Sequence, residues 1–442
     1  MISEELASFV TTTGRTKLPS DVLTMARQSL LDWTGSAIRG SVEPPTRMLI
    51  DLAREEGGQP RATALPDGWK TSVTWATRIN AAASHTMEMD DLHPASVLHP
   101  AATVIPAALA MGEALDSSGI ELIEAIVVGY EIAIRAGEAA GRTHYKYWQT
   151  TATCGTFGAA MAAAKLLKLD TERIINALGS AGTQAAGLWV FLEDGAMSKQ
   201  LHPAHAAAAG IMAAELARRG FTAARRIFEG PKGFLDAMSA EPRPELLTQG
   251  LGSEFHMADN SFKKHAACRH THSAIDAVLK VRGDDIGPEE IEHVTVAVYP
   301  AAYDLLNAVE PTTTYAAKFS LPFTVATALS RGHAELRDFE DVNAIDIVNL
   351  IPNIEVVRDE SLGENYPQKW PARVTLRGRD GTERSALVEY PHGDARNPLT
   401  QGELEEKFRT LTTDLLSPEQ QNHVILASNR IKDYSVRAFW PF

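Results

Sequence analysis

The sequence predicts a mainly α protein in which helical regions at both chain ends flank an α+β segment. Residues 1–262 show helical spacing of apolar side chains, interrupted by short breaks. Residues 263–399 mix strand-like runs with helical ones. From residue 400 to 442 the pattern is helical again, and it opens with Thr400 and Glu403 in capping-box spacing. We therefore expect three segments with these bounds.

The N-terminal helices are predicted from periodicity and composition. In "SDVLTMARQSLLDWTGSAI", Val22, Met25, Leu30 and Trp33 recur at helical spacing. The segment "AHAAAAGIMAAELARRG" is rich in alanine, which favours helix strongly. Its many small side chains predict close packing against neighbouring helices.

The middle segment combines strands with helices. "EHVTVAVYP" alternates Val294, Val296 and Val298 with other residues, which is typical of a strand. "ARVTLRGRDGTERSALVEYP" has two strand-like runs around Asp380-Gly381, a favoured hairpin turn. "KFSLPFTVATALSRG" and "FEDVNAIDIVNLI" are predicted to be helices.

Bulk properties exclude several classes of protein. A length of 442 residues favours two domains, and a net charge of −14 argues against nucleic acid or an anionic membrane as a partner. Two cysteines are too few for a disulfide framework or a cysteine-rich zinc module. The N-terminus lacks the pattern of a signal peptide, and no apolar run reaches the roughly 18 residues of a membrane span. We expect a soluble cytoplasmic protein.

The stretch "HTMEMDDLHPASVLHPAATVIPAAL" groups titratable residues beside an apolar run. These residues are His85, Glu88, Asp90, Asp91, His93 and His99. Helical spacing would place His85, Glu88 and Asp91 on one face. A metal site usually has histidines in i, i+4 spacing, and a diphosphate site needs a second acidic motif; neither is present. Acid–base chemistry is therefore favoured over both, and over a solvated helix end.

Two further clusters carry positive charge. "SFKKHAACRHTHSAID" holds Lys263, Lys264 and Arg269 with three histidines, and no acid occurs from Asn260 to Ile275. It predicts a trap for carboxylates that Arg269 could bind bidentately; the alternative is a surface basic patch.

In "AMSKQLHPAHAA", Lys199 and His202 precede a helix, where the alternative is a solvated lysine. The glycines of the nearby "GSAGTQAAG" lack the spacing of a dinucleotide fingerprint or a P-loop and are interpreted as close helix packing.

Together these segments resemble the MmgE/PrpD family, which includes 2-methylcitrate dehydratases, cis-aconitate decarboxylases and iminodisuccinate epimerases. The matching stretches include "HTMEMDDLHPASVLHPAATVIPAALA", "CGTFGAAMAAAKLL", "SKQLHPAHAA", "KKHAACRHTHSAIDA", "KFSLPFTVATAL" and "YPHGDARNPLTQGELEEKF". They occur in the family's order and cover nearly the whole chain.

The resemblance implies a helical domain built from both chain ends, an inserted α+β lid, and a homodimer. It also implies an active site in the cleft between domain and lid, without metal or organic cofactor. The family's chemistry is proton transfer at a carbon next to a carboxylate. Such chemistry needs a positioned base and cations that hold the carboxylate.

The resemblance also implies roles for individual residues. The second aspartate pair of the family's D-F-D-D corresponds to Asp90 and Asp91, the later H-P histidine to His99, and the lysine before L-H to Lys199. We expect His99 to be the base, because the following proline turns it out of a helix and imidazole titrates near neutrality. Asp91 and Glu88 are expected to orient either this imidazole or the substrate hydroxyl, with Lys199 completing the catalytic set.

The remaining residues are expected to bind substrate. They are Asp90, His93, Gln149, His202, Lys263, Lys264, Arg269 and His272. Three positions depart from the family pattern. Glu88 replaces an aspartate, Gln149 replaces a histidine, and Leu92 replaces a hydroxyl residue common in the decarboxylases.

The predicted function is a cofactor-independent lyase for a di- or tricarboxylic acid, with 2-methylcitrate dehydratase-like dehydration as the first interpretation. Decarboxylation as in the cis-aconitate decarboxylases, or epimerisation of the iminodisuccinate type, is the alternative. A second alternative is a polycarboxylate-binding protein that has lost catalysis, because Gln149 cannot exchange a proton.

Overall fold

The computed structural model describes residues 1–14, 18–307 and 311–442 and confirms the mainly α class. Within these residues, no helix combines the length and the apolar composition that crossing a membrane would require. The chain divides into two compact units. Unit 1 comprises Met1–Asn260 and Thr400–Phe442, and unit 2 comprises Ser261–Leu399.

Unit 1 is a set of packed helices. They are α1 (Ile2–Thr12), α2 (Ser20–Gly40), α3 (Pro44–Glu56), α4 (Val73–Thr86), α5 (Ala101–Leu115), α6 (Gly119–Tyr145), α7 (Thr150–Leu166), α8 (Thr171–Gly182), α9 (Phe191–Asp194), α10 (Leu201–Arg218), α11 (Phe234–Met238), α17 (Gln401–Thr412) and α18 (Pro418–Asn429). Helix α7 packs against α5, α6, α8 and α10.

Small residues allow these helices to approach closely. A Cβ placed on Gly158 of α7 would lie 2.6 Å from the Gly129 carbonyl oxygen of α6. One placed on Gly210 of α10 would lie 2.6 Å from the Cβ of Ala159. The close packing predicted for the alanine-rich segment is therefore confirmed, and a larger side chain at either glycine would push two helices apart.

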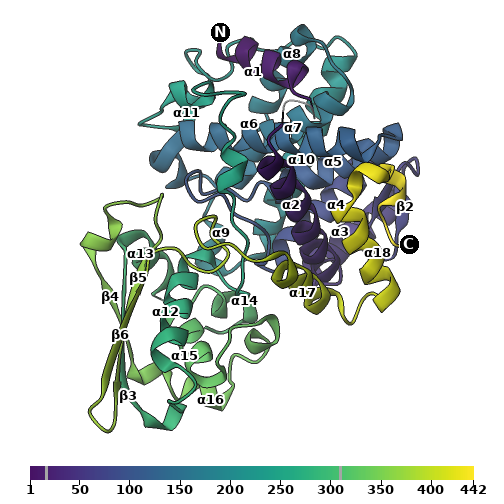
Figure 1. Ribbon diagram of the computed structural model, residues 1–442. Helices are drawn as coiled ribbons and strands as arrows, with labels where there is room; N and C mark the ends of the chain where they lie inside the picture. Colours follow the sequence, from purple (N-terminus) through teal and green to yellow (C-terminus); the bar gives the residue numbers. More distant parts are fainter. Residues whose placement is uncertain (15–17, 308–310) are drawn as a thin grey trace. The chain divides into compact units, whose positions relative to one another are not determined.

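The C-terminal helices belong to the same unit as the N-terminal ones. Figure 1 shows α17 and α18 (yellow) against α2 (purple), and both contact it. The predicted capping box is confirmed: the Glu403 amide donates to Thr400 Oγ1 (3.2 Å), and the Thr400 amide donates to Glu403 Oε2 (2.8 Å). Farther along α17, Lys407 Nζ donates to Asp32 Oδ1 (2.5 Å) and to the Met89 carbonyl oxygen (2.7 Å).

Unit 1 also contains a two-stranded antiparallel sheet that the sequence did not predict. Its strands are β1 (Ala62–Ala64) and β2 (Trp69–Thr71). The buried carboxylate of Glu113 accepts from the amide and the hydroxyl of Thr63, both at 2.7 Å. A strand of three residues is too short to show an alternation of apolar and polar side chains, so these two strands could not be recognised from the sequence pattern.

Unit 2 contains a four-stranded sheet with strand order β4-β3-β5-β6. The strands are β3 (Ile291–Val298), β4 (Ile354–Arg358), β5 (Ala372–Gly378) and β6 (Glu383–Val388). The pair β3–β4 is parallel, and β3–β5 and β5–β6 are antiparallel. The predicted strand and hairpin are confirmed: the valines of β3 alternate into the core, and Gly381 turns the hairpin at φ 84°.

Helices pack on this sheet within unit 2, as Figure 1 shows for α12 (His272–Arg282) and α15 (Leu321–Arg331). The described residues of unit 2 also form the shorter α-helices α13 (Pro300–Leu306), α14 (Thr314–Ala317) and α16 (Ile345–Val348). The helix predicted for "FEDVNAIDIVNLI" is confirmed only in part, since α16 covers Ile345–Val348 of that segment. The Asp341 side chain accepts from the Asn343 amide (2.9 Å), a local turn that competes with helix.

Candidate active site

The titratable cluster lies mainly on a loop, between the end of α4 at Thr86 and the start of α5 at Ala101. The expectation that His85, Glu88 and Asp91 share a helix face is wrong, because only His85 is helical. Glu88 adopts a left-handed conformation (φ 59°), which ends the helix and turns the chain. The loop is largely buried, so its polar groups must find partners inside the protein.

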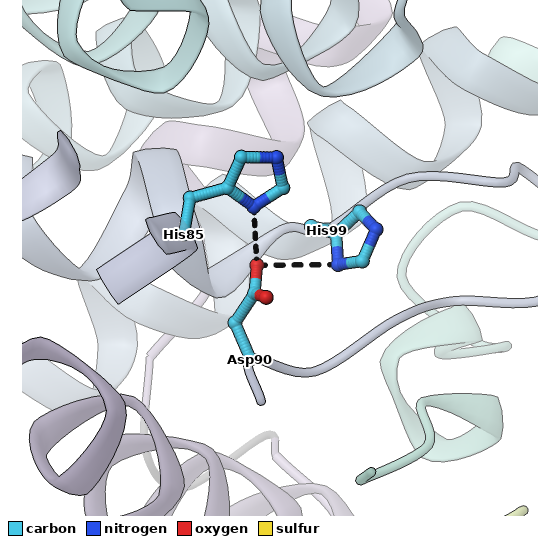
Figure 2. Close-up of side chains that lie close together, drawn as sticks. All are labelled: His85, Asp90 and His99. Carbon is cyan, nitrogen blue, oxygen red and sulfur yellow. Dashed lines mark hydrogen bonds and ion pairs between the residues drawn. The ribbon is translucent and has the colours of Figure 1, made fainter. Parts of the chain in front are cut away.

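Asp90 lies at the centre of the cluster. Figure 2 shows its Oδ2 between two imidazole rings, 2.7 Å from His85 Nδ1 and 3.2 Å from His99 Nδ1. Burial opposes ionisation, but the charges and hydrogen bonds of His85 and His99 hold the pKa of Asp90 well below its usual value. Asp90 is thus an ionised acceptor shared by two histidines.

His99 presents one nitrogen to the protein and leaves the other for chemistry. Its Nδ1 lies 2.6 Å from the Asp91 carbonyl oxygen, which can only accept, so Nδ1 carries a proton. The backbone amide of His99 donates to Thr151 Oγ1 (3.1 Å). The rings of His85 and His99 meet edge-on, with 4.9 Å between their centroids. The side chain is 13% exposed, whereas those of Asp90 and His85 are fully buried. His99 therefore combines a fixed ring with access to solvent.

The carboxylate of Asp91 is held in place by hydrogen bonds from the protein. Its Oδ2 accepts from Tyr130 Oη (2.8 Å) and Asn260 Nδ2 (2.7 Å), and its Oδ1 accepts from the Ala101 amide (3.1 Å). Burial, and then the charge of Asp32, raise the pKa of Asp91 to about 7. The expectation that the Asp91 carboxylate orients His99 is corrected, since Asp90 makes that contact.

Glu88 and Lys199 form a buried ion pair. Lys199 lies in a short 3₁₀ helix, η2 (Met197–Gln200), directly before α10. The predicted lysine is therefore buried rather than solvated, and its charge faces the polar loop. Glu88 fixes this lysine instead of orienting the imidazole as expected.

Gln149 bridges two histidines. Its Nε2 lies 3.2 Å from His85 Nε2, and its Oε1 lies 2.5 Å from His202 Nδ1. Gln149 is the N-cap of α7, and His202 lies in the first turn of α10. The structure thus brings Gln149 and His202 into the cluster through contacts with other side chains.

His93 closes the loop on itself. The Ser96 Oγ lies 2.9 Å from its Nδ1, and the Ser96 amide lies 3.3 Å from the same atom. Its backbone pairs with Leu98. These contacts give His93 a role in the loop's shape, and its expected contact with substrate stays a prediction.

Three of these side chains could also hold a metal ion. His85 Nδ1, Asp90 Oδ2 and His99 Nδ1 lie within 4.8 Å of one another. The sequence argument against a metal required i, i+4 histidines, and the loop brings two histidines together without that spacing. A divalent ion would have to displace the hydrogen bonds that both Nδ1 atoms make with Asp90.

The basic segment of unit 2 is mostly buried, and two of its side chains pair with acids, one at the end of the segment and one far along the chain. Arg269 Nη2 lies 3.5 Å from Asp394 Oδ2, and His265 Nε2 lies 2.8 Å from Asp276 Oδ1. Burial lowers the pKa of Arg269. Asp276 and Asp394 therefore partly neutralise the positive charge of this segment, and the binding of carboxylates there stays a prediction.

The other expected residues of unit 2 differ in exposure. Lys263 is buried and Lys264 is exposed. His272 begins α12, where its Nε2 lies 3.2 Å from the Ala267 carbonyl oxygen. Burial, and then the charge of Arg269, hold the pKa of His272 well below its usual value, so its imidazole is neutral.

Sequence reasoning did not select four residues that support the loop: Asp32, Tyr130, Asn260 and Lys407. Tyr130 and Asn260 hold Asp91, and Lys407 joins Asp32 to the Met89 carbonyl. The only signal in the sequence for these residues was a charged residue, Asp32 or Lys407, in the middle of a segment with the pattern of an amphipathic helix.

Comparison with known proteins agrees with this architecture. Residues 4–247 match the model of the MmgE/PrpD N-terminal domain, and residues 265–433 match that of the C-terminal domain. The cis-aconitate decarboxylase of Aspergillus terreus is 26% identical over 98% of this chain and 94% of its own length. The mouse enzyme of that name is 24% identical over 98% and 91%, and the human one 25% over 94% and 89%. The chain therefore belongs to the MmgE/PrpD family of lyases.

Proposed function

We propose that this protein is a lyase that decarboxylates an unsaturated tricarboxylate of the cis-aconitate class. The observation that carries the proposal is the match to cis-aconitate decarboxylases over nearly the full length of both chains. The site supports it with a fixed, partly exposed imidazole beside an ionised carboxylate. The first interpretation from sequence, dehydration of 2-methylcitrate, has no specific support among these relatives.

The proposed reaction moves one proton and releases one molecule of carbon dioxide. The bond between carbon and the departing carboxylate breaks, and its electron pair forms a new C=C bond with the neighbouring carbon. The electrons of the old C=C bond take up a proton at its far carbon. The enzyme must therefore supply a proton donor and must hold the remaining carboxylates.

His99 is the proposed donor. Its Nδ1 is held by the Asp91 carbonyl and faces Asp90, which leaves Nε2 to carry the transferred proton. The carboxylate of Asp90 lies 3.2 Å from Nδ1 and helps to hold the ring in this orientation. In a dehydration the same nitrogen would instead remove a proton from the substrate. The arrangement of His99 is therefore compatible with either reaction.

Lys199 is the proposed cation for a substrate carboxylate. An ammonium group has three N–H donors, so its pair with Glu88 is compatible with a second bond to substrate. Contributions from Lys263, Lys264, Arg269 and His272 of unit 2 stay predictions, as do the homodimer and the independence from cofactors.

A substrate panel tests the proposal. Purified protein is incubated separately with cis-aconitate, citrate and 2-methylcitrate, while released carbon dioxide and products are followed by NMR. The proposal predicts that carbon dioxide is released from cis-aconitate, and that His99→Gln releases it at least roughly 10²-fold more slowly. Loss of water from 2-methylcitrate without carbon dioxide would restore the dehydratase interpretation. Saturable binding without any product would indicate a binding protein.

A further inference from the structure

A chain of hydrogen bonds runs from Asp90 through His85 and Gln149 to His202. Asp90 is ionised and can only accept, so His85 Nδ1 carries a proton. With its proton on Nδ1, the ring of His85 has a bare Nε2 that can accept, in keeping with its 3.2 Å contact with the amide nitrogen of Gln149. Whatever faces Nε2 must therefore donate.

Gln149 meets that requirement in only one orientation. Its NH₂ group faces His85 Nε2 at 3.2 Å and donates to it. Its carbonyl oxygen then faces His202 Nδ1 at 2.5 Å and can only accept. A flipped amide would place an oxygen against one bare nitrogen, with two acceptors in contact.

The proton on His202 is fixed in turn. Its Nδ1 donates to Gln149, and burial followed by the charge of Lys199 lowers the pKa of His202 to about 4. The neutral ring therefore has a bare Nε2. Phe191 packs edge-on against the ring at 5.4 Å, and a Cβ on Gly187 would lie 3.4 Å from it. In the part of the chain that the structure describes, no side chain or backbone group donates to this nitrogen.

We propose that His202 is a further substrate-binding residue whose Nε2 accepts a hydrogen bond from an O–H group of the substrate, and that Gln149 is the positioning residue that fixes this nitrogen. The inference rests on the proposed function and identifies the chemistry of one substrate contact. A bare nitrogen repels an ionised carboxylate, so the partner is either a protonated carboxyl group or a hydroxyl group. Lys199, three residues before His202 in the chain, supplies the positive charge that binds an ionised carboxylate.

Two inert ligands distinguish the sources of that O–H group. Citrate has a hydroxyl group, and propane-1,2,3-tricarboxylate lacks one but has the same three carboxyl groups. A hydroxyl contact predicts that only citrate affects His202. A contact with a protonated carboxyl group predicts that both ligands do, and that the effect weakens as pH rises.

The test is long-range ¹H–¹⁵N NMR of the full chain with ¹⁵N-labelled histidine, with His202 assigned from His202→Gln. We expect His202 to have a protonated Nδ1 and a bare Nε2 without ligand, and its Nε2 signal to move saturably on addition of one or both ligands. Gln149→Leu should mix the two tautomers of His202 and weaken binding roughly 3- to 10-fold, the effect of one ordinary hydrogen bond. The control Gln184→Leu removes a part-buried glutamine from the turn that follows α8 and should change neither.

Three outcomes would overturn the inference. One is a protonated Nε2 in the free protein, and another is a single His202 tautomer in folded Gln149→Leu. The third is a ligand that moves the His99 signals and leaves His202 unchanged, which would spare the proposed function. If neither ligand moved any histidine signal, the inference would also fail, and release of carbon dioxide from cis-aconitate would decide the proposed function separately. The wild-type spectra decide the first and third outcomes even where Gln149→Leu does not fold.

Discussion

Replacing Asp90 with asparagine tests the assignment of this residue, rather than Asp91, as the partner of His99. Asparagine keeps the shape and one acceptor oxygen but removes the charge that two histidines share. A charge-assisted hydrogen bond contributes about 1.5–3 kcal/mol and a neutral one about 0.5–1.5 kcal/mol, so each contact loses roughly 1–1.5 kcal/mol. Only the 3.2 Å contact with His99 bears on proton transfer. Since about 1.4 kcal/mol is a tenfold change in rate, turnover should fall roughly 5- to 12-fold.

Stability should respond differently. The variant loses two charged contacts but no longer buries a carboxylate, so the unfolding free energy near neutral pH should change by less than about 2 kcal/mol. The pKa of Asp90 is lowered by folding, so its charge stabilises the wild type above the unfolded pKa, and this contribution is lost as pH falls through the folded pKa. The asparagine variant should lack that acid-dependent loss.

The measurements are kcat at several pH values and chemical unfolding from pH 3 to pH 7, for Asp90→Asn and Asp91→Asn. Turnover of Asp90→Asn within about threefold of the wild type, together with an inactive but folded Asp91→Asn, would refute the assignment and restore Asp91 as the orienting residue.

Four further predictions follow from the site. His99→Gln should lower turnover by at least roughly 10²-fold, the low end for general acid–base catalysis, with little change in melting temperature; near-normal turnover would remove His99 from the mechanism. Lys199→Ala should lose turnover and also about 3–5 kcal/mol of stability, because it leaves Glu88 buried without its cation; adding Glu88→Gln should restore stability alone, and recovery of turnover in the double variant would exclude Lys199 from catalysis. Folding raises the pKa of Asp91, so between pH 4 and 7 the folded state binds a proton that the unfolded state has lost. The unfolding free energy of the wild type should therefore fall as pH rises, by up to about 1.4 kcal/mol per pH unit. The same slope in Asp91→Asn would show that another group causes this pH dependence. Turnover should survive exhaustive chelation, whereas loss that a divalent ion reverses would identify His85, Asp90 and His99 as metal ligands.

The sequence contained enough information for the fold class and for the segments that form the cluster. Periodicity marks α2, β3 and the β5–β6 hairpin, because each buries one regular face. The H-P step correctly placed His99 outside a helix, since it lies on the loop before α5. Lys199 was found through its local segment, although its burial was not foreseen.

The division of roles between Asp90 and Asp91 could not be predicted, because it depends on a backbone turn. The left-handed Glu88 redirects the chain, and the two adjacent carboxylates then face different partners. No propensity rule predicts a glutamate with φ 59°.

Long-range pairs were equally hidden. Gln149 lies 64 residues from His85, and Asp394 lies 125 residues from Arg269. Counting charges along the sequence reveals the basic segment. It does not reveal Asp394, which folding places beside Arg269. The hydrogen-bond direction through Gln149 likewise depends on burial, which sequence spacing does not reveal.

The central claim is that the protein releases a carboxyl group while it protonates carbon. The most direct measurement follows cis-aconitate in D₂O by ¹H and ¹³C NMR and counts carbon dioxide and deuterium per molecule consumed. The account predicts one carbon dioxide and one carbon-bound deuterium in each product molecule. Consumption of substrate with addition of water, and without carbon dioxide, would contradict it.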